Sequence, residues 1–191
     1  MSAFLRVWGI ALIIISSCWN LVGQGVIYVD QKANGNMDGS SWQDAYTDLR
    51  PAIEAAVPGD AIWVAEGVYR PGDTLQSRYV IDKDIRLLGG FSGTEDLEAD
   101  RNPEVYETIL SGDVFQNDLP GDLQTNRQDN LFTILEIGLS ATQDALVDGF
   151  TFRGGHARGD NTFLTNAWGG AIFCSGAPII RACRFEDQFA K

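Results

Sequence analysis

The sequence predicts an all-β chain in which short strand-turn-strand units stack into a solenoid. One short pattern occurs twice, at Val147–Phe152 and at Ile180–Phe185. Helical periodicity is nearly absent from the rest of the chain. Units that bury an apolar face only by stacking on their neighbours are typical of solenoid proteins. We also expect the centres of successive units to be the apolar residues that recur every 23 to 25 residues, namely Val64, Leu87, Leu110 and Leu135.

The repeated pattern itself predicts a corner between two strands. Each copy has an apolar residue, a two-residue break, and then an apolar, a polar and an apolar residue. A period of two on both sides of a break indicates strands that meet at a sharp turn. Gly149 permits the backbone angles of such a turn. We expect Phe150, Phe152 and Phe185 to point inward and stabilise the corner, at about 1.5–3 kcal/mol for each buried ring.

The charge of the chain narrows its possible partners. The 191 residues include 14 basic and 26 acidic side chains, and the formal net charge is -12. A surface this negative repels nucleic acids and anionic membranes, so neither is an expected partner. Solubility alone is the other explanation of the charge.

The first 25 residues are predicted to be a signal peptide. Arg6 precedes the apolar run 7–15, which is too short to span a bilayer but suits the core of a signal peptide. Small residues at Gly23 and Gly25 mark a cleavage zone before Val26. In an alternative interpretation Cys18 ends a lipobox and is lipidated. Both predict export, to the extracellular space or the cell surface, with an outer-membrane lipoprotein as the second case.

Residues 26–60 are predicted to form an N-terminal strand and a short cap helix. The strand is 26–29, and the helix spans 47–56 with Thr47 or Asp48 as its cap. Its apolar face would cover the open end of the solenoid, which otherwise exposes unpaired strand edges. Trp42 is expected to pack on this cap.

Several segments resemble right-handed parallel β-helix proteins of the pectate-lyase-like superfamily, in particular large secreted or surface proteins of Bacteroidetes and planctomycete type. The resemblance rests on short segments distributed over 26–191: Tyr28–Asp30, Gly39–Trp42, Pro58–Tyr69, Ile85–Glu95, Arg101, Thr108–Asp113, Asp129–Ile137 and Gly169–Phe173. It implies a right-handed parallel β-helix, formed as a single-stranded solenoid of coils over 61–191. Gly149 and Ala182 depart from the pattern, because such proteins often place a ladder of Asn side chains at this corner.

The end of the chain is expected to be truncated. The last predicted strand is followed by no helix or polar segment that would close the solenoid. The resemblance therefore predicts an N-terminal portion of a longer protein, or an end that another subunit covers. Cys174 and Cys183 lie in two strand-like segments, and we expect free thiols, although an exported protein permits a disulfide.

An acidic loop offers candidate metal ligands. Oxygen-rich loops bind calcium, and β-helix polysaccharide lyases often use calcium to acidify a proton beside a uronate carboxylate. A solvated insertion without metal is the alternative, since clusters of Asn and Asp usually mark loops. The candidates are Asp113, Asp118, Asp122 and Asp129.

A second set of residues offers candidate binding groups. Arg153 or Arg158 would neutralise a uronate, and His156 would act as a general base, although no residue that would orient it is visible. Trp168 belongs with three further aromatic residues that either stack on sugar rings or pack in the core, Trp63, Tyr69 and Tyr79.

Two classes of function remain open. The first is a non-catalytic surface, adhesive or glycan-binding module whose partners are polysaccharides or surface proteins. The second is the N-terminal part of a lyase or hydrolase of acidic polysaccharides. Catalytic Lys or Arg residues of such lyases lie several coils into the fold, whereas Lys32, Lys83 and Lys191 are scattered. This distribution favours the binding module.

Overall fold

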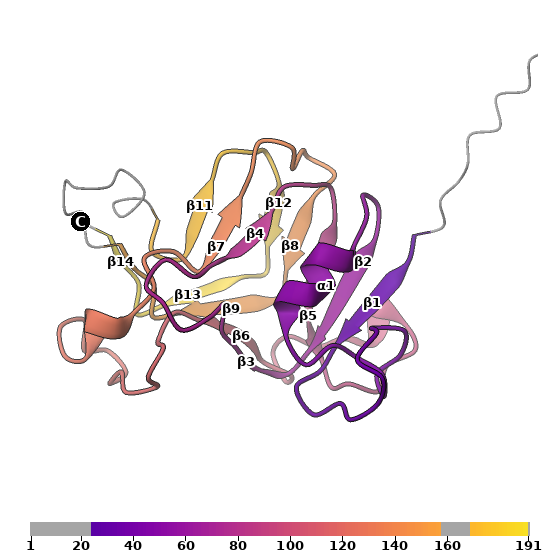
Figure 1. Ribbon diagram of the computed structural model, residues 1–191, viewed down its shortest axis with the longest axis horizontal. Coiled ribbons are helices and arrows are strands. Elements are labelled where there is room, and N and C mark those ends of the chain that lie inside the picture. The colour runs from indigo at the N-terminus through magenta and orange to yellow at the C-terminus, as the bar shows by residue number, and fades with distance from the viewer. Residues whose placement is uncertain (1–23, 158–168, 191) are drawn as a thin grey trace, which may run out of the picture.

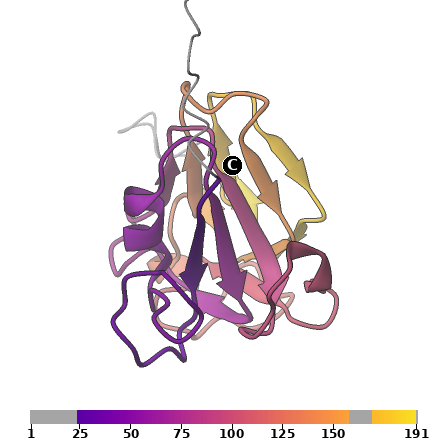
Figure 2. The same ribbon diagram turned by 90° about the vertical axis from the view of Figure 1, so that its right-hand side faces the viewer.

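The computed structural model describes residues 24–157 and 169–190 (Figures 1 and 2). The predicted signal peptide therefore lies almost wholly outside the described residues, as does Cys18 of the alternative lipobox. No helix within the described ranges is long and apolar enough to cross a membrane.

Short strands dominate the described part, with a single α-helix near its start. The N-terminal half has β1 (Val26–Val29), α1 (Leu49–Ala55), β2 (Ala61–Ala65), β3 (Gly67–Tyr69), β4 (Tyr79–Ile81), β5 (Arg86–Phe91) and β6 (Thr108–Ser111). The C-terminal half has β7 (Leu135–Ile137), β8 (Leu146–Asp148), β9 (Phe150–Arg153), β10 (His156–Ala157), β11 (Ile172–Cys174), β12 (Ile179–Arg181), β13 (Arg184–Glu186) and β14 (Phe189–Ala190). Two 3-10 turns, η1 (Glu98–Asp100) and η2 (Arg127–Asp129), lie in the longer loops.

The described strands form four parallel sheets. The five-stranded sheet has the order β1-β2-β5-β8-β12, the four-stranded sheet β13-β9-β6-β3, and the three-stranded sheet β11-β7-β4. A two-stranded sheet joins β10 to β14. Figure 1 shows the strands of the larger sheets running side by side from the helix end toward the C-terminal strands.

The predicted fold class, a right-handed parallel β-helix, is wrong. A right-handed parallel β-helix would be one continuous single-stranded solenoid, whereas the described strands belong to four separate short sheets of two to five strands. The chain is sheet-rich and only weakly all-β, because its strands are short and irregular segments occupy much of its length.

The spacing of 23 to 25 residues gave a wrong prediction because the four apolar residues do not occupy equivalent positions in one sheet. Val64 and Leu87 both lie in the five-stranded sheet, but Leu110 lies in the four-stranded sheet and Leu135 in the three-stranded sheet. Loops of unequal length separate the strands, so a constant interval in sequence does not mean a constant position in the sheet.

The strand-corner-strand structure predicted for the repeated pattern is confirmed in both copies, and the two copies pair with each other in the folded chain. Val147 is the register partner of Ile180, and Phe152 is the partner of Phe185. Both corners adopt left-handed backbone conformations, with φ of 81° at Gly149 and 47° at Ala182. Gly149 has a second reason to lack a side chain, because a Cβ there would lie 2.8 Å from Nη1 of Arg101.

A buried carboxylate stabilises this corner in addition to the aromatic rings. Asp148 is 1% exposed. Its Oδ2 lies 2.7 Å from Nη2 of Arg101 and 2.5 Å from Nε of Arg181. Phe150 and Phe152 point inward as predicted and are fully buried. The inward burial predicted for Phe185 is wrong, because 52% of its surface is exposed.

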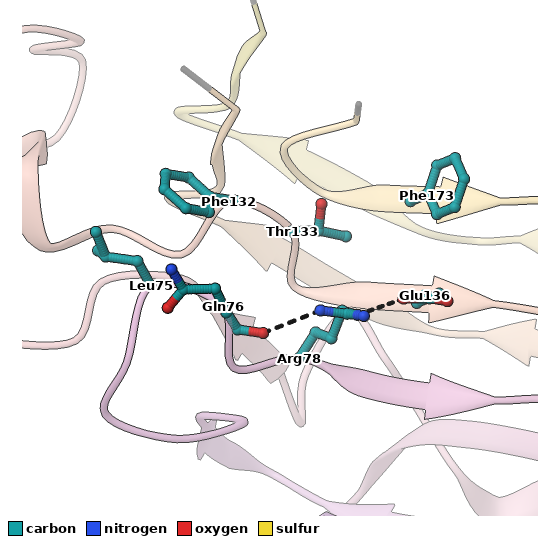
Figure 3. Close-up of a pocket in the computed structure, with 7 residues that line it drawn as sticks. All are labelled: Leu75, Gln76, Arg78, Phe132, Thr133, Glu136 and Phe173. Atoms are coloured by element: carbon teal, nitrogen blue, oxygen red, sulfur yellow. Dashed lines mark hydrogen bonds and ion pairs between the residues drawn. The ribbon is translucent and has the colours of Figure 1, made fainter. Parts of the chain in front are cut away.

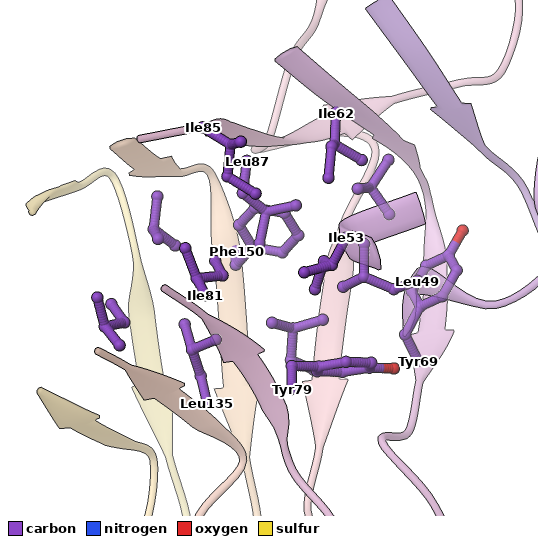
Figure 4. Packing of buried hydrophobic residues seen from close by; sticks show 14 of the residues in the cluster. Leu49, Ile53, Ile62, Tyr69, Tyr79, Ile81, Ile85, Leu87, Leu135 and Phe150 are labelled. Carbon is purple, nitrogen blue, oxygen red and sulfur yellow. The ribbon is translucent and has the colours of Figure 1, made fainter. Parts of the chain in front are cut away.

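The predicted cap helix is present as α1. The side chain of Asp48 accepts a hydrogen bond from the backbone N of Arg50, so Asp48 is the N-cap. Leu49 and Ile53 project from the helix into the same core as Tyr69 and Tyr79 (Figure 4). The helix thereby buries the apolar ends of the first strands.

Aromatic packing differs from the prediction at one tryptophan. Trp42 does not pack on α1 but lies in a separate cluster on the five-stranded sheet, against Tyr28 at 4.8 Å and Phe91 at 5.6 Å between ring centroids. Trp63 stacks on Phe91 in this cluster. Trp63, Tyr69 and Tyr79 are buried and belong to the packing of the chain, as one of the two interpretations expected.

Candidate functional site

An open groove lies between two loops of the described part. We call it the loop groove. It has a volume of about 610 Å³ and is lined by 73–76, which precede β4, and by part of the loop between β6 and β7. From the second loop it takes Val114, Phe115, Asn117, Asn126, Gln128 and Asp129.

Carboxylates within the second loop fix its shape through bonds to backbone groups. Asp113 accepts hydrogen bonds from the backbone N of Asn117 at 3.2 Å and of Asp118 at 3.1 Å. Asp129 accepts one from the backbone N of Phe115 at 2.9 Å. Short side chains that bond neighbouring amides in this way are common turn formers, and here they order a loop that lacks strand pairing.

A buried arginine anchors the same loop from behind. Arg127 is 3% exposed, forms an ion pair with Asp118, and donates from Nε to the carbonyl of Asp122 at 2.8 Å. Burial raises the pKa of Asp118, although its hydrogen bond from Asn130 and the charge of Arg127 act in the opposite direction. Removing either member of such a buried pair leaves an uncompensated charge.

The anchored loop presents one aromatic ring to solvent. Phe115 is 71% exposed and lines the groove. The next residue, Gln116, has φ of 58°, and Asn126 has φ of 61°, both in the left-handed region. The side chain of Asn126 donates to the carbonyl of Asn117 at 2.7 Å, which ties the two sides of the loop together. Backbone held in sparsely populated regions often marks a functional loop.

A smaller hollow of about 80 Å³ adjoins the groove through shared residues (Figure 3). Leu75 and Gln76 line both hollows. Arg78 forms an ion pair with Glu136 across β4 and β7, and it also donates to the carbonyl of Gln76 at 3.2 Å. The remaining walls are Phe132, Thr133 and Phe173.

The four predicted metal ligands do not converge on one point. Asp113, Asp122 and Asp129 bond backbone amides of the loop, while Asp118 pairs with Arg127. Among the described residues, no group of three or more His, Cys, Asp or Glu side chains is arranged to hold a metal ion. Calcium remains a prediction of the sequence without a site that the described geometry supports.

Two of the predicted binding residues are described, and each makes its contacts within a different sheet. Arg153 lies in β9 and pairs with Glu186 at 2.8 Å on the four-stranded sheet. His156 lies in β10, where its ring packs against Phe189 at 4.6 Å between centroids. Arg158 and Trp168 lie outside the described residues. The described geometry therefore does not assemble these residues into one site.

Of the residues that line the groove, sequence reasoning singled out Asp129, as a candidate metal ligand, and missed Phe115. Phe115 carried a usable signal, since it is an isolated aromatic residue in a run of Asp, Asn and Gln. Arg78 and Glu136 carried none, because they are 58 residues apart and meet only through the pairing of β4 with β7.

Cys174 and Cys183 are free thiols, as expected. Neither cysteine lines the loop groove or the smaller hollow. The resemblance to pectate-lyase-like proteins gains no outside support, because neither family models, curated proteins nor solved structures give a match to this chain.

Proposed function

We propose that this chain is an exported, non-catalytic module that binds glycans in the loop groove. The observation that carries the proposal is the ring of Phe115, which is 71% exposed on a loop that hydrogen bonds and a buried ion pair hold in place. An aromatic face stacks on the apolar face of a sugar ring, and a fixed loop loses little entropy when it binds.

The polar lining supports the same proposal. Gln76, Asn117, Asn126 and Gln128 offer amide groups that both donate and accept hydrogen bonds. Sugar hydroxyls require both kinds of partner, and sites that fix the orientation of a ligand use a few such groups beside apolar contacts.

The described cations favour binding over lyase chemistry. Lys32 pairs with Glu66 at 2.9 Å, and Lys83 donates to the carbonyl of Ala56 at 2.6 Å. Arg78, which lines the smaller hollow beside the groove, pairs with Glu136. A general base must reach the proton that it removes, and these groups are engaged in structural contacts.

The test is affinity electrophoresis and calorimetry against a panel of soluble polysaccharides. We expect binding to at least one polymer, and Phe115→Ala should weaken it about tenfold, which corresponds to about 1.4 kcal/mol. Leu139→Ala is the matched control, since Leu139 is 81% exposed but does not line the groove.

The same samples decide between binding and catalysis. Incubation with uronate polysaccharides, with and without calcium, should produce no unsaturated ends by ultraviolet absorbance. Formation of product would overturn the proposal in favour of a lyase, and absence of binding to the whole panel would overturn it altogether.

A further inference from the structure

We infer that the loop groove selects uncharged glycans over uronate-containing ones. This inference rests on the proposed function and names the class of ligand. It starts from the charge of the lining, where Asp73 and Asp129 are the two ionisable side chains and both are acidic.

Neither carboxylate faces a compensating cation in the groove. Asp73 is exposed. Asp129 accepts a hydrogen bond from a neutral group, the backbone N of Phe115. The adjoining cation, Arg78, is already matched by the carboxylate of Glu136. A uronate that enters the groove would bring a third negative charge without a partner, and like charges at short range disfavour binding.

The same carboxylates suit a neutral sugar. An ionised carboxylate accepts two hydrogen bonds at once, and bonds to a charged acceptor are stronger than neutral ones. Neighbouring hydroxyls of a sugar ring donate in this arrangement while Phe115 stacks on the ring face. The formal net charge of -12 adds a long-range repulsion against polyanions that weakens with salt.

The experiment compares a polyanionic polymer with its uncharged form and with other neutral polymers. The probes are polygalacturonate and its carboxyl-reduced form, together with neutral mannan, xylan and glucan, measured by calorimetry at low and high salt. We expect at least one neutral polymer to bind, and polygalacturonate to bind at least tenfold more weakly than the best neutral polymer at low salt. Added salt should narrow this difference.

A pair of variants separates the charge of the groove from the charge of the whole chain. Asp73→Asn with Asp129→Asn removes both groove carboxylates, while the Asn side chain at 129 keeps an acceptor for the backbone N of Phe115. Asp96→Asn with Asp144→Asn removes the same net charge at exposed positions outside the groove. We expect only the first pair to raise affinity for polygalacturonate severalfold and to weaken neutral binding.

The outcomes are distinct for the two proposals. Binding of polygalacturonate as tightly as any neutral polymer would overturn the selectivity and leave the glycan-binding function standing. An equal effect of the two variant pairs would also overturn it, because the charge of the groove would then have no special role. Failure of every polymer to bind would overturn both proposals.

Discussion

The two ends of the strand array use similar residues and bury them very differently. At the N-terminal end, α1 covers the first strands, and Leu49, Ile53 and Ile62 are at most 5% exposed. At the C-terminal end, Ile179 of β12 is 49% exposed and Phe185 of β13 is 52% exposed. Both ends carry apolar side chains, from α1 and β2 at one end and from β12 and β13 at the other.

The difference shows that the burial of an apolar side chain here depends on the neighbouring strands and not on the residue type. Phe152 and Phe185 are register partners whose rings stack at 5.3 Å with an interplanar angle of 10°. Phe152 is fully buried because β9 lies between β6 and β13, whereas Phe185 has a strand on one side in the described part. The same aromatic position therefore contributes different free energy in neighbouring strands.

The largest expected effect is the contrast between these two rings. Phe152→Ala should lower the free energy of unfolding by about 3–5 kcal/mol, because it removes a buried ring and leaves a cavity. Phe185→Ala is the matched variant and should cost less than half as much, since its ring is already half in water. Urea unfolding of both proteins measures the difference, and equal losses would contradict the role of neighbouring strands.

A smaller effect tests the cover at the N-terminal end. Asp48→Ala removes the N-cap of α1 and should cost about 1 kcal/mol of stability. Asp48→Asn keeps an acceptor for the backbone N of Arg50 and should stay within a few tenths of a kcal/mol of the parent. Thermal unfolding distinguishes the two, and a loss of the same size in both variants would argue against the capping bond.

Acid should act locally on the loop that bonds to the C-terminal turn. Hydrogen bonds from Thr125 and Gln124 lower the pKa of Asp122 from 3.8 to about 2. A lowered folded-state pKa means that Asp122 stabilises the folded state above pH 3.8 and that this contribution is lost as the pH falls toward about 2. The amide resonance of Thr125 should titrate with a midpoint near 2.

The control for this titration is Asp122→Asn, in which the midpoint at the Thr125 amide should vanish. A midpoint near 3.8 in the parent protein would contradict the hydrogen-bonding arrangement. The backbone N of Gln124 also donates to Oδ1 of Asp122, at 2.8 Å, so the amide of Gln124 is a second reporter.

The smallest effect concerns reactivity and leaves stability unchanged. Burial raises the pKa of the Cys183 thiol, while Cys174 is exposed. Iodoacetamide at mildly alkaline pH should therefore modify Cys174 first, as peptide mass spectrometry would show. The two thiols should react at similar rates in denaturant, and equal rates in the native protein would contradict the partial burial of Cys183.

Local features of the fold could be predicted because they depend on neighbours in sequence. The cap at Asp48 and the helix after it follow from residues within two turns of the chain. The corner at Gly149 follows from a pattern that is visible in each copy. The prediction that Leu110 and Leu135 occupy equivalent positions is wrong because the loop between them leads the chain into a different sheet.

The candidate site depended on contacts that no local pattern encodes. The groove forms where 73–76 meets the loop around Phe115, and the hollow beside it depends on the ion pair of Arg78 with Glu136. Asp113 and Asp129 are candidate metal ligands by sequence alone, because a sequence displays charge but not hydrogen-bond partners. In the folded chain their acceptors bond backbone amides.

The sequence by itself determined many of the strand-forming segments, the cap helix, the acidic charge and the inward direction of Phe150 and Phe152. Only the tertiary structure decided how the strands divide into four sheets, which apolar residues are covered, and where a ligand has room to bind. The physical reason is the separation in sequence over which each kind of interaction acts. Alternation and capping act over a few residues, whereas burial and ion pairing depend on segments that the loops bring together from far along the chain.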